Sequence, residues 1–141
     1  MKEGIGVEER LSRKSGKPSE DLSCNWHYKT SPSYDGSAST DATGKWCIFV
    51  GAAEVDEVWS KTSGAIESDQ LTCAKASTAL RSMGRIGHVI CVYMRDWADR
   101  QDLMRAREVL QSLGFVKELD YKRDIDTRNR IYGPSEWYLR A

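Results

Sequence analysis

Continuous and alternating apolar runs predict strands in the middle of the chain. Residues 45–51 (KWCIFVG) are apolar on both alternating faces, which predicts a central strand. Residues 88–93 (HVICVY) are rich in the β-branched and aromatic side chains that favour a pleated sheet. Further strands are expected at residues 25–29, 71–77, 115–121 and 136–139.

Two other segments follow the helical period. In residues 54–66 apolar side chains recur at intervals of three and four, and acidic residues occupy the first turn, where the helix dipole favours them. Residues 100–113 repeat the pattern, with Asp96 or Asp99 available as a cap and Gly114 as a stop. The predicted stripes are Val55, Val58, Trp59, Thr62 and Ile66, and Leu103, Ala106, Val109 or Leu110, and Leu113.

The order of these elements predicts an α+β fold. Short connections favour hairpins, so we expect a curved antiparallel β-sheet of about six strands with the two main helices packed on one face. Loops are expected at residues 30–44, which are rich in Ser and Thr, at 81–87 and in the charged segment 122–135. Residues 1–21 are polar and are expected to form a flexible N-terminal arm before a single domain at residues 22–141.

Composition narrows the possible functions. The chain has 21 Lys+Arg and 21 Asp+Glu, so no overall field draws it to nucleic acid or to an anionic membrane. No apolar run is long enough to span a bilayer, and the N-terminal segment lacks the apolar core of a secretory signal. The 4 cysteines have no Cys-x-x-Cys spacing, which favours free thiols in a reducing compartment over disulfides or a metal site. We therefore expect a cytoplasmic protein without membrane contact, metal or cofactor.

Lys75 is the first candidate for chemistry. It lies among small residues in the predicted strand 71–77, a setting that can lower the pKa of an amine and suit it as a base or a phosphate ligand. His88, at the start of the next strand, is a candidate acid–base partner. The alternatives are an outward-pointing lysine and a hydrogen-bonded histidine at a strand end.

A second candidate group is basic. Arg95 follows the strand at 88–93, while Lys122 and Arg123 begin the charged loop, so their side chains form a rim for phosphate if the strand ends are neighbours. Aspartates interleave with them, and a solvated mixed-charge loop is the alternative. Trp97 lies in the adjoining turn and is expected to be partly exposed. Motifs of P-loop, dinucleotide-binding and common hydrolase sites are absent from the sequence.

Several ordered segments resemble a known family. The segments are TGKWCIFV, VDEVW, CAKAST, HVICVYMRDWADRQDLMRAREVL and LDYKRDIDTRNRIYG, within residues 24–141. They are similar to the basophilic-leukaemia-expressed protein family, which is grouped with the fold of the cap-binding translation initiation factors. The resemblance implies the same sheet, with helices on one face and a ligand face opposite.

The cap-binding factors imply specific positions for a ligand. They hold a methylated guanine between two Trp rings, with an acidic side chain on its edge and basic residues on its phosphates. Tyr34 and Asp35 stand where those factors place a Trp-Glu pair, and Lys75 lies near their phosphate-binding residues. The helix and loop that supply the second stacking Trp have no counterpart here, so a related ligand face is implied rather than cap recognition itself.

Three functions are consistent with these residues. The first is the binding of a nucleotide-like or phosphorylated small molecule on the open sheet face, with charge from Lys75, Arg95 and Lys122. The second is a phosphothreonine-lyase-like reaction, a label that some relatives of the resembled family carry, with Lys75 as base, His88 as acid and Arg95 on the phosphate. The third is a protein-interaction domain, because the cap-binding factors also bind partner helices on their helical face.

Overall fold

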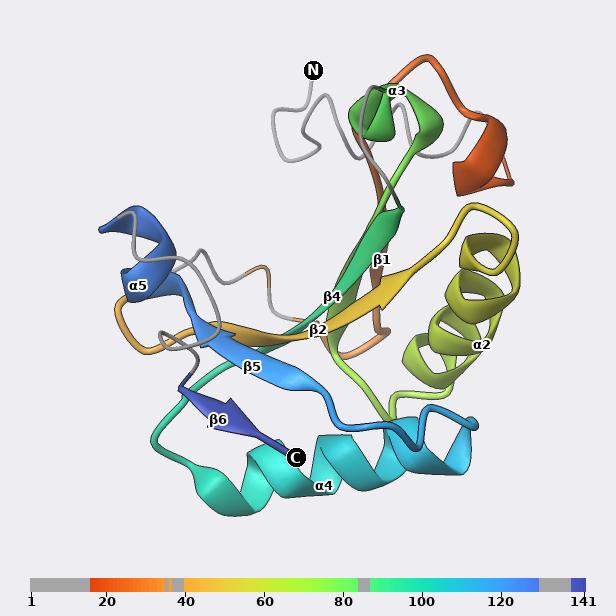
Figure 1. The fold of residues 1–141 in the computed structure, drawn as a ribbon. Coiled ribbons are helices and arrows are strands. Elements are labelled where there is room, and N and C mark those ends of the chain that lie inside the picture. Colours follow the sequence, from red (N-terminus) through yellow and green to blue (C-terminus); the bar gives the residue numbers. More distant parts are fainter. Residues whose placement is uncertain (1–15, 35, 37–39, 84–86, 130–137) are drawn as a thin grey trace.

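A computed structural model describes residues 16–34, 36, 40–83, 87–129 and 138–141 of the chain. Its centre is an open antiparallel sheet of six strands in the order β1-β3-β4-β2-β5-β6 (Figure 1). The predicted α+β fold with a six-stranded antiparallel sheet is therefore confirmed. The strands are β1 (Trp26–Thr30), β2 (Gly44–Val50), β3 (Cys73–Ser77), β4 (His88–Met94), β5 (Asp120–Arg123) and β6 (Leu139–Arg140).

The two long helices pack on one face of this sheet. The core is formed by residues of both helices together with alternate residues of the central strands. None of the helices in the described ranges is long and apolar enough to cross a membrane. The helical elements are η1 (Pro18–Glu20), α2 (Val55–Glu67), α3 (Ala79–Ser82), α4 (Arg100–Ser112) and α5 (Asp124–Arg128).

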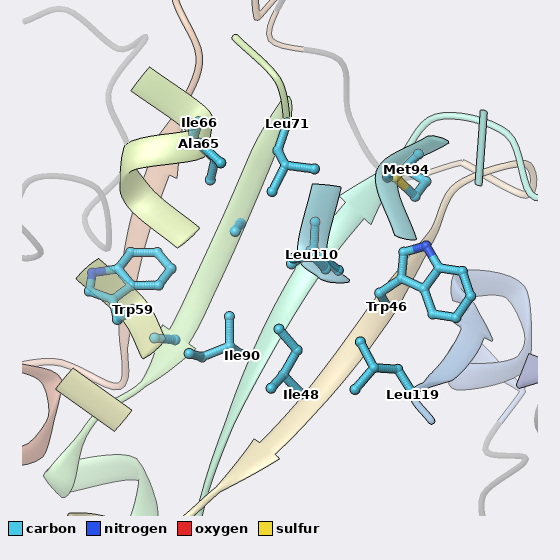
Figure 2. Close-up of a cluster of buried hydrophobic side chains, with 14 of the residues drawn as sticks. Trp46, Ile48, Trp59, Ala65, Ile66, Leu71, Ile90, Met94, Leu110 and Leu119 are labelled. Carbon is cyan, nitrogen blue, oxygen red and sulfur yellow. The ribbon is translucent and has the colours of Figure 1, made fainter. Parts of the chain in front are cut away.

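The strand register places the apolar residues together on the helix-covered face. Trp46 lies opposite Val92, and Ile48 lies opposite Ile90, because β2 and β4 are antiparallel neighbours. Figure 2 shows Trp46, Ile48 and Ile90 in one cluster with Trp59 of α2 and Leu110 of α4. The Trp46 indole N–H donates to the carbonyl of Leu103 at 3.1 Å, so this fully buried ring also satisfies its polar atom. We call this side the covered face.

The alternate residues of the same strands form the opposite side, which we call the open face. Side chains alternate along a strand, so residues opposite one another in adjacent strands share a face. Pairing of Lys75 with Tyr28 and with Cys91 places these three on the open face. The open face comprises Trp26, Tyr28, Lys45, Cys47, Phe49, Cys73, Lys75, Val89, Cys91, Tyr93, Asp120 and Lys122.

The segment before β5 differs from the predicted strand at residues 115–121. Only residues from Asp120 onward join β2, and in the preceding segment the carbonyls of Phe115 and Lys117 are bound by Arg107. Its guanidinium donates to the carbonyls of Phe115, Lys117 and Ala141 at 2.7–2.8 Å. Arg107 is 1% exposed, so a cation of α4 fixes this turn and the last strand from inside the protein.

Two predicted loops contain short helices. Thr78 accepts the N–H of Arg81 through its hydroxyl and caps α3, within the expected hairpin connection at residues 81–87. The charged segment after β5 begins with α5, whose backbone follows directly from the strand. Residues 84–86 and 130–137 lie outside the described residues.

The described end of the predicted arm packs on the domain. Ser19 donates to the Asp56 carboxylate from both its N–H, at 3.0 Å, and its hydroxyl, at 2.5 Å. Asp21 is 4% exposed. The packed part of the chain therefore begins before the predicted boundary at residue 22, while residues 1–15 lie outside the described residues.

Candidate functional site

Lys75 lies at the centre of an aromatic group on the open face. Its ammonium is 3.9 Å from the ring centroid of Trp26, 5.8 Å from that of Tyr93 and 6.0 Å from that of Tyr28. These rings come from the strands on either side of β3, so the register of the sheet assembles them. Electron-rich ring faces attract an ammonium ion, and the arrangement therefore holds the cation in a defined place.

A cavity of about 650 Å³ adjoins this aromatic group. Tyr28 and Tyr93 belong to both, so the walls beside the Lys75 ammonium are also walls of the cavity. Burial is the main cause that raises the pKa of Tyr93, which keeps its phenol neutral and able to donate a hydrogen bond. The other lining residues are Tyr34, Thr43, Thr72, Cys73, Met94, Arg95, Asp96, Asp99, Asp102, Arg105 and Asp124.

The carboxylates that line the cavity already have partners within the protein. Asp99 accepts the backbone N–H of Asp102 and caps α4, and Asp102 accepts the side chain of Arg105 at 2.9 Å. Arg105 also donates to the carbonyl of Gln70 at 2.8 Å. Asp96 accepts the backbone N–H of Ala98 at 2.9 Å. The lining of the cavity therefore combines carboxylates that are held by hydrogen bonds with tyrosine rings that adjoin the Lys75 ammonium.

A polar network joins β2 to α5 beside the cavity. The Lys45 ammonium donates to Asp124 at 2.8 Å and to the hydroxyl of Thr127 at 3.1 Å. The hydroxyl of Thr43 donates to the other oxygen of the same carboxylate at 2.7 Å. Lys122 lies opposite Lys45 in the β2–β5 ladder and is 6% exposed. The open face therefore carries three lysines on three strands: Lys45, Lys75 and Lys122.

Trp97 and Arg123 form a separate group on the covered side of the sheet edge. The Arg123 guanidinium stacks 4.7 Å from the Trp97 ring centroid and holds Asp126 with two hydrogen bonds of 2.9 Å. That ion pair raises the pKa of Arg123. Trp97 also packs edge-on against Tyr138 at 5.2 Å. Neither Trp97 nor Arg123 lines the cavity beside Lys75.

His88 is likewise not brought together with Lys75. It lies two residues from Ile90 in β4 and thus on the covered face, whereas Lys75 is paired with Cys91 on the open face. The His88 Nδ1–H donates to the carbonyl of Ser77 at 2.8 Å, since a carbonyl can only accept. This is the hydrogen-bonded histidine at a strand end.

The remaining predicted residues lie as follows. Tyr34 and Arg95 line the cavity together with the two tyrosines beside Lys75. Asp35 lies outside the described residues. The structure therefore brings Lys75, Tyr34 and Arg95 around one cavity and its aromatic wall, with Lys122 farther along the same face. The sequence-based choice missed Trp26, Tyr28 and Tyr93, which the register of β1, β3 and β4 brings to Lys75.

One group among the described residues has the composition of a metal site. Ligand atoms of Asp21, Cys24 and His27 all lie within 4.8 Å of one another, and all three residues are buried. The imidazole Nε2 and one carboxylate oxygen are 2.6 Å apart, which is a direct hydrogen bond. Burial opposes ionisation of Asp21, but donors from Ser23, His27 and Cys24 outweigh it and hold the pKa of Asp21 well below its usual range. The hydrogen bonds account for this cluster without a metal.

Comparisons with known proteins agree on the fold. Three solved structures of eIF4E proteins share it, at identities of 12–18%, which is a likeness of fold alone. C. elegans eIF4E-3 with the 4E-binding protein Mextli and a cap analog has a TM-score of 0.61, covering 82% of this chain and 68% of that one, at 16% identity. Ascaris suum eIF4E-3 with m7G cap scores 0.59, with coverages of 82% and 67% at 12% identity.

The third structure is covered less completely. Schistosome eIF4E complexed with m7GpppA and 4E-BP has a TM-score of 0.55 at 18% identity, and the match covers 71% of this chain. The chain spans 59% of the length of that protein. A family model described as "Basophilic leukemia-expressed protein Bles03" matches residues 37–128, which is more than half of the chain.

Proposed function

We propose that this chain, which belongs to the basophilic leukemia-expressed protein Bles03 family, binds a nucleotide-like or phosphorylated small molecule on the open face of its sheet. The proposal depends on one observation, which is that the same aromatic side chains lie beside the Lys75 ammonium and line the cavity. Tyr28 and Tyr93 flank the Lys75 ammonium and also line the cavity of about 650 Å³. A volume of this size is typical of small-molecule sites.

The charges around the cavity favour one orientation of the ligand. The aromatic end offers ring faces for a base to stack on, and Lys75 beside them can reach an anionic group such as phosphate. Among the other lining residues, Asp96 and Asp124 carry acceptor oxygens suited to the N–H groups on the edge of a base. The proposed ligand therefore has its phosphate beside Lys75 and its base edge against these carboxylates.

The structural neighbours support a ligand of this class. These proteins were solved in complex with m7GpppA, with a cap analog and with m7G cap, and m7GpppA is a nucleotide. At these identities the neighbours provide the fold, whereas the aromatic group around Lys75 is a feature of this chain.

The two other hypotheses have less support from the geometry. A lyase that pairs Lys75 with His88 needs both side chains on one face, and they lie on opposite faces. Two neighbours were solved with a 4E-binding protein or 4E-BP. On α4, however, the exposed positions are polar, which offers little apolar surface to a partner helix; they are Arg100, Gln101, Arg105, Glu108, Gln111 and Ser112.

Tryptophan fluorescence tests the proposal, because Trp26 is the ring closest to the Lys75 ammonium. We would titrate the chain at low salt with nucleosides and with their mono-, di- and triphosphates. We expect quenching by the nucleotides and much weaker binding of the matched nucleosides, since a charge-assisted phosphate contact contributes about 1.5–3 kcal/mol. Equal affinity for nucleoside and nucleotide, or no response to any compound, contradicts the proposal.

A matched pair of variants locates the site. K75Q is expected to weaken nucleotide binding by roughly tenfold or more through loss of that contact. K29Q makes the same charge change in the neighbouring strand, but Lys29 lies on the covered side and pairs with Glu67 at 2.6 Å. Binding should therefore survive K29Q, and an equal loss in both variants would indicate a non-specific charge effect.

A further inference from the structure

Two cysteines face each other at the centre of the open face. Cys47 of β2 lies directly opposite Cys91 of β4 in the antiparallel ladder. Both are free thiols, and they are 5% and 6% exposed. The ligand hypothesis above does not use them, so their juxtaposition needs an explanation of its own.

The hydrogen bonds of the sheet show which kind of pair they form. The N–H of Asp124 donates to the carbonyl of Thr43, so the backbone of Thr43 is directed toward the β5 side. Backbone groups alternate along a strand, and the same direction therefore holds for Lys45 and Cys47. In β4, the N–H of Val89 donates to the hydroxyl of Ser77, so the backbone N–H of Val89 is directed toward β3. By the same alternation, the backbone groups of Cys91 are also directed toward β3.

Cys47 and Cys91 are thus a non-hydrogen-bonded pair of the β2–β4 ladder. In such a pair the Cα atoms are about 4.5 Å apart and the side chains are closer than elsewhere in the ladder. A disulfide needs a Cα separation of about 4.4–6.8 Å. The register of the folded sheet therefore supplies the spacing for a bond between these two sulfurs without movement of either strand.

The other cysteines do not offer this geometry. Cys73 lies opposite Tyr93 and is a diagonal neighbour of Cys91, at a typical separation of about 7–8 Å, which is too far for a disulfide. Cys24 precedes β1 and its thiol contacts Asp21 at 3.5 Å. Burial and this contact raise the pKa of Cys24, which makes its thiolate scarce.

The charges around the pair favour one thiolate. The Cys47 thiol is the main cause that lowers the pKa of Cys91, with Lys75 and Lys45 acting in the same direction against burial. Lys75 is the direct partner of Cys91 in the β3–β4 ladder. The Cys91 thiol is also the main cause that raises the pKa of Cys47, followed by burial. Its position opposite Lys75 in the ladder therefore favours Cys91 as the nucleophile of the pair, with Cys47 as the resolving thiol.

We infer that Cys47 and Cys91 form a redox-modification site, at which a hydroperoxide converts the two thiols into a reversible disulfide. The Cys91 thiolate attacks one peroxide oxygen, the O–O bond breaks, and sulfenic acid and hydroxide (or alkoxide) result. The Cys47 sulfur then attacks the sulfenic sulfur, which forms the S–S bond and releases water. Two electrons pass from the two sulfurs to the peroxide, and a small thiol reverses the change by exchange.

Peptide mapping of the full chain tests this inference directly. The native protein is exposed to hydrogen peroxide, remaining thiols are alkylated, and the digest is analysed by mass spectrometry. We expect a linked peptide joining Cys47 to Cys91, a fall in intact mass equal to two hydrogen atoms, and recovery of both thiols with dithiothreitol. The inference is overturned if the link joins Cys73 instead, or if it forms only between molecules. It is also overturned if peroxide oxidises the half-buried Cys73 while Cys47 and Cys91 stay reduced.

Two variants separate the roles of the sulfurs. C47S removes the resolving thiol, so Cys91 should stop at sulfenic acid, which dimedone captures. C91S should form neither the linkage nor the dimedone adduct at Cys47. C73S serves as the control and should still form the disulfide. A failure of nucleotide binding would leave all of these readouts unchanged, because none of them depends on a ligand.

Discussion

The two faces of the sheet are built from alternate residues of the same strands, yet they differ in almost every property. On the covered face Trp46, Ile90 and Val92 are fully buried against α2 and α4. On the open face Lys75 lies among aromatic rings, and Cys47 lies against Cys91. One backbone thus carries an apolar core on one side and lysine, aromatic and thiol side chains on the other, in alternate positions along each strand.

This contrast indicates that stability depends mainly on the covered face and that binding and reactivity depend mainly on the open face. Substitutions that remove contacts of the covered face should unfold the protein, whereas substitutions on the open face should change binding or reactivity with little loss of stability. Four predictions test this separation, from the largest expected loss of stability to the smallest.

Replacing Arg107 by methionine should have the largest effect. The buried guanidinium donates to three carbonyls, and its removal takes this donor from all three, although that of Ala141 keeps the N–H of Leu119, at a cost of about 4 kcal/mol in the free energy of unfolding. Urea denaturation measures the loss. R105M is the control in the same helix, where a half-exposed pair with Asp102 should contribute less than about 1 kcal/mol. Similar losses in both variants would show that Arg107 is not an internal anchor.

Gly44 to alanine should be the next most damaging change. A Cβ there would lie 2.4 Å from the hydroxyl oxygen of Tyr121, a fully buried side chain, so ring or strand must shift at a cost of about 2–3 kcal/mol. G64A is the matched control, because nothing lies within 4 Å of its Cβ and alanine favours a helix by about 0.5–1 kcal/mol. The two substitutions should therefore shift the melting temperature in opposite directions.

Asp21 to asparagine should cost about 2 kcal/mol at neutral pH through loss of its charge-assisted hydrogen bonds. The pKa of Asp21 is lower in the folded protein than in the unfolded chain. Its contribution is therefore complete above the unfolded pKa of about 3.9 and is lost as the pH falls toward the folded pKa. The urea midpoints of the wild type and of D21N should be measured at about pH 7 and about pH 3. The difference between the two midpoints should be smaller at the lower pH.

The exposed pair of Glu67 with Lys29 provides the control for that pH dependence. E67Q should change stability by less than about 1 kcal/mol at neutral pH, because solvent screens this pair. A gap between the wild type and D21N that is equally wide at both pH values would show that the Asp21 carboxylate gains no stability from its buried donors.

Lys75 to glutamine should cost least, below about 1 kcal/mol, because a single cation–π contact group is removed from a partly exposed site. Heat denaturation followed by circular dichroism would measure it alongside the binding assay. A stability loss as large as that of R107M would place Lys75 in the structural framework and end the separation between the two faces.

The covered face was the part of the fold that periodicity could predict. The helical stripe through Leu103, Ala106 and Leu110 and the alternation in β2 are both borne out, since each depends on spacing within one element. Arg107 adjoins that stripe, but three carbonyl partners distant in sequence decide that it is buried, and no local pattern shows them.

The candidate site depends on register between strands, which the sequence leaves open. The sequence suggests Lys75 and His88 as an acid–base couple because their strands are neighbours. In the structure Lys75 is opposite Cys91, so His88 lies on the other face of the sheet. The same register brings Tyr28 and Tyr93 to Lys75 from two strands. Which side chains meet on the open face depends on how the strands pair. The alternation of residues within one strand does not reveal that pairing.

The short last strand has a consequence for assembly. Among the described residues β1 and β6 are the outer strands of the sheet, and β6 comprises Leu139 and Arg140. Arg140 forms an ion pair with Asp120 at 2.6 Å, so this edge of the sheet carries charged side chains. Short, charged borders resist the docking of a foreign strand. Within the described residues, a second copy of the sheet would gain a ladder of two residues along β6.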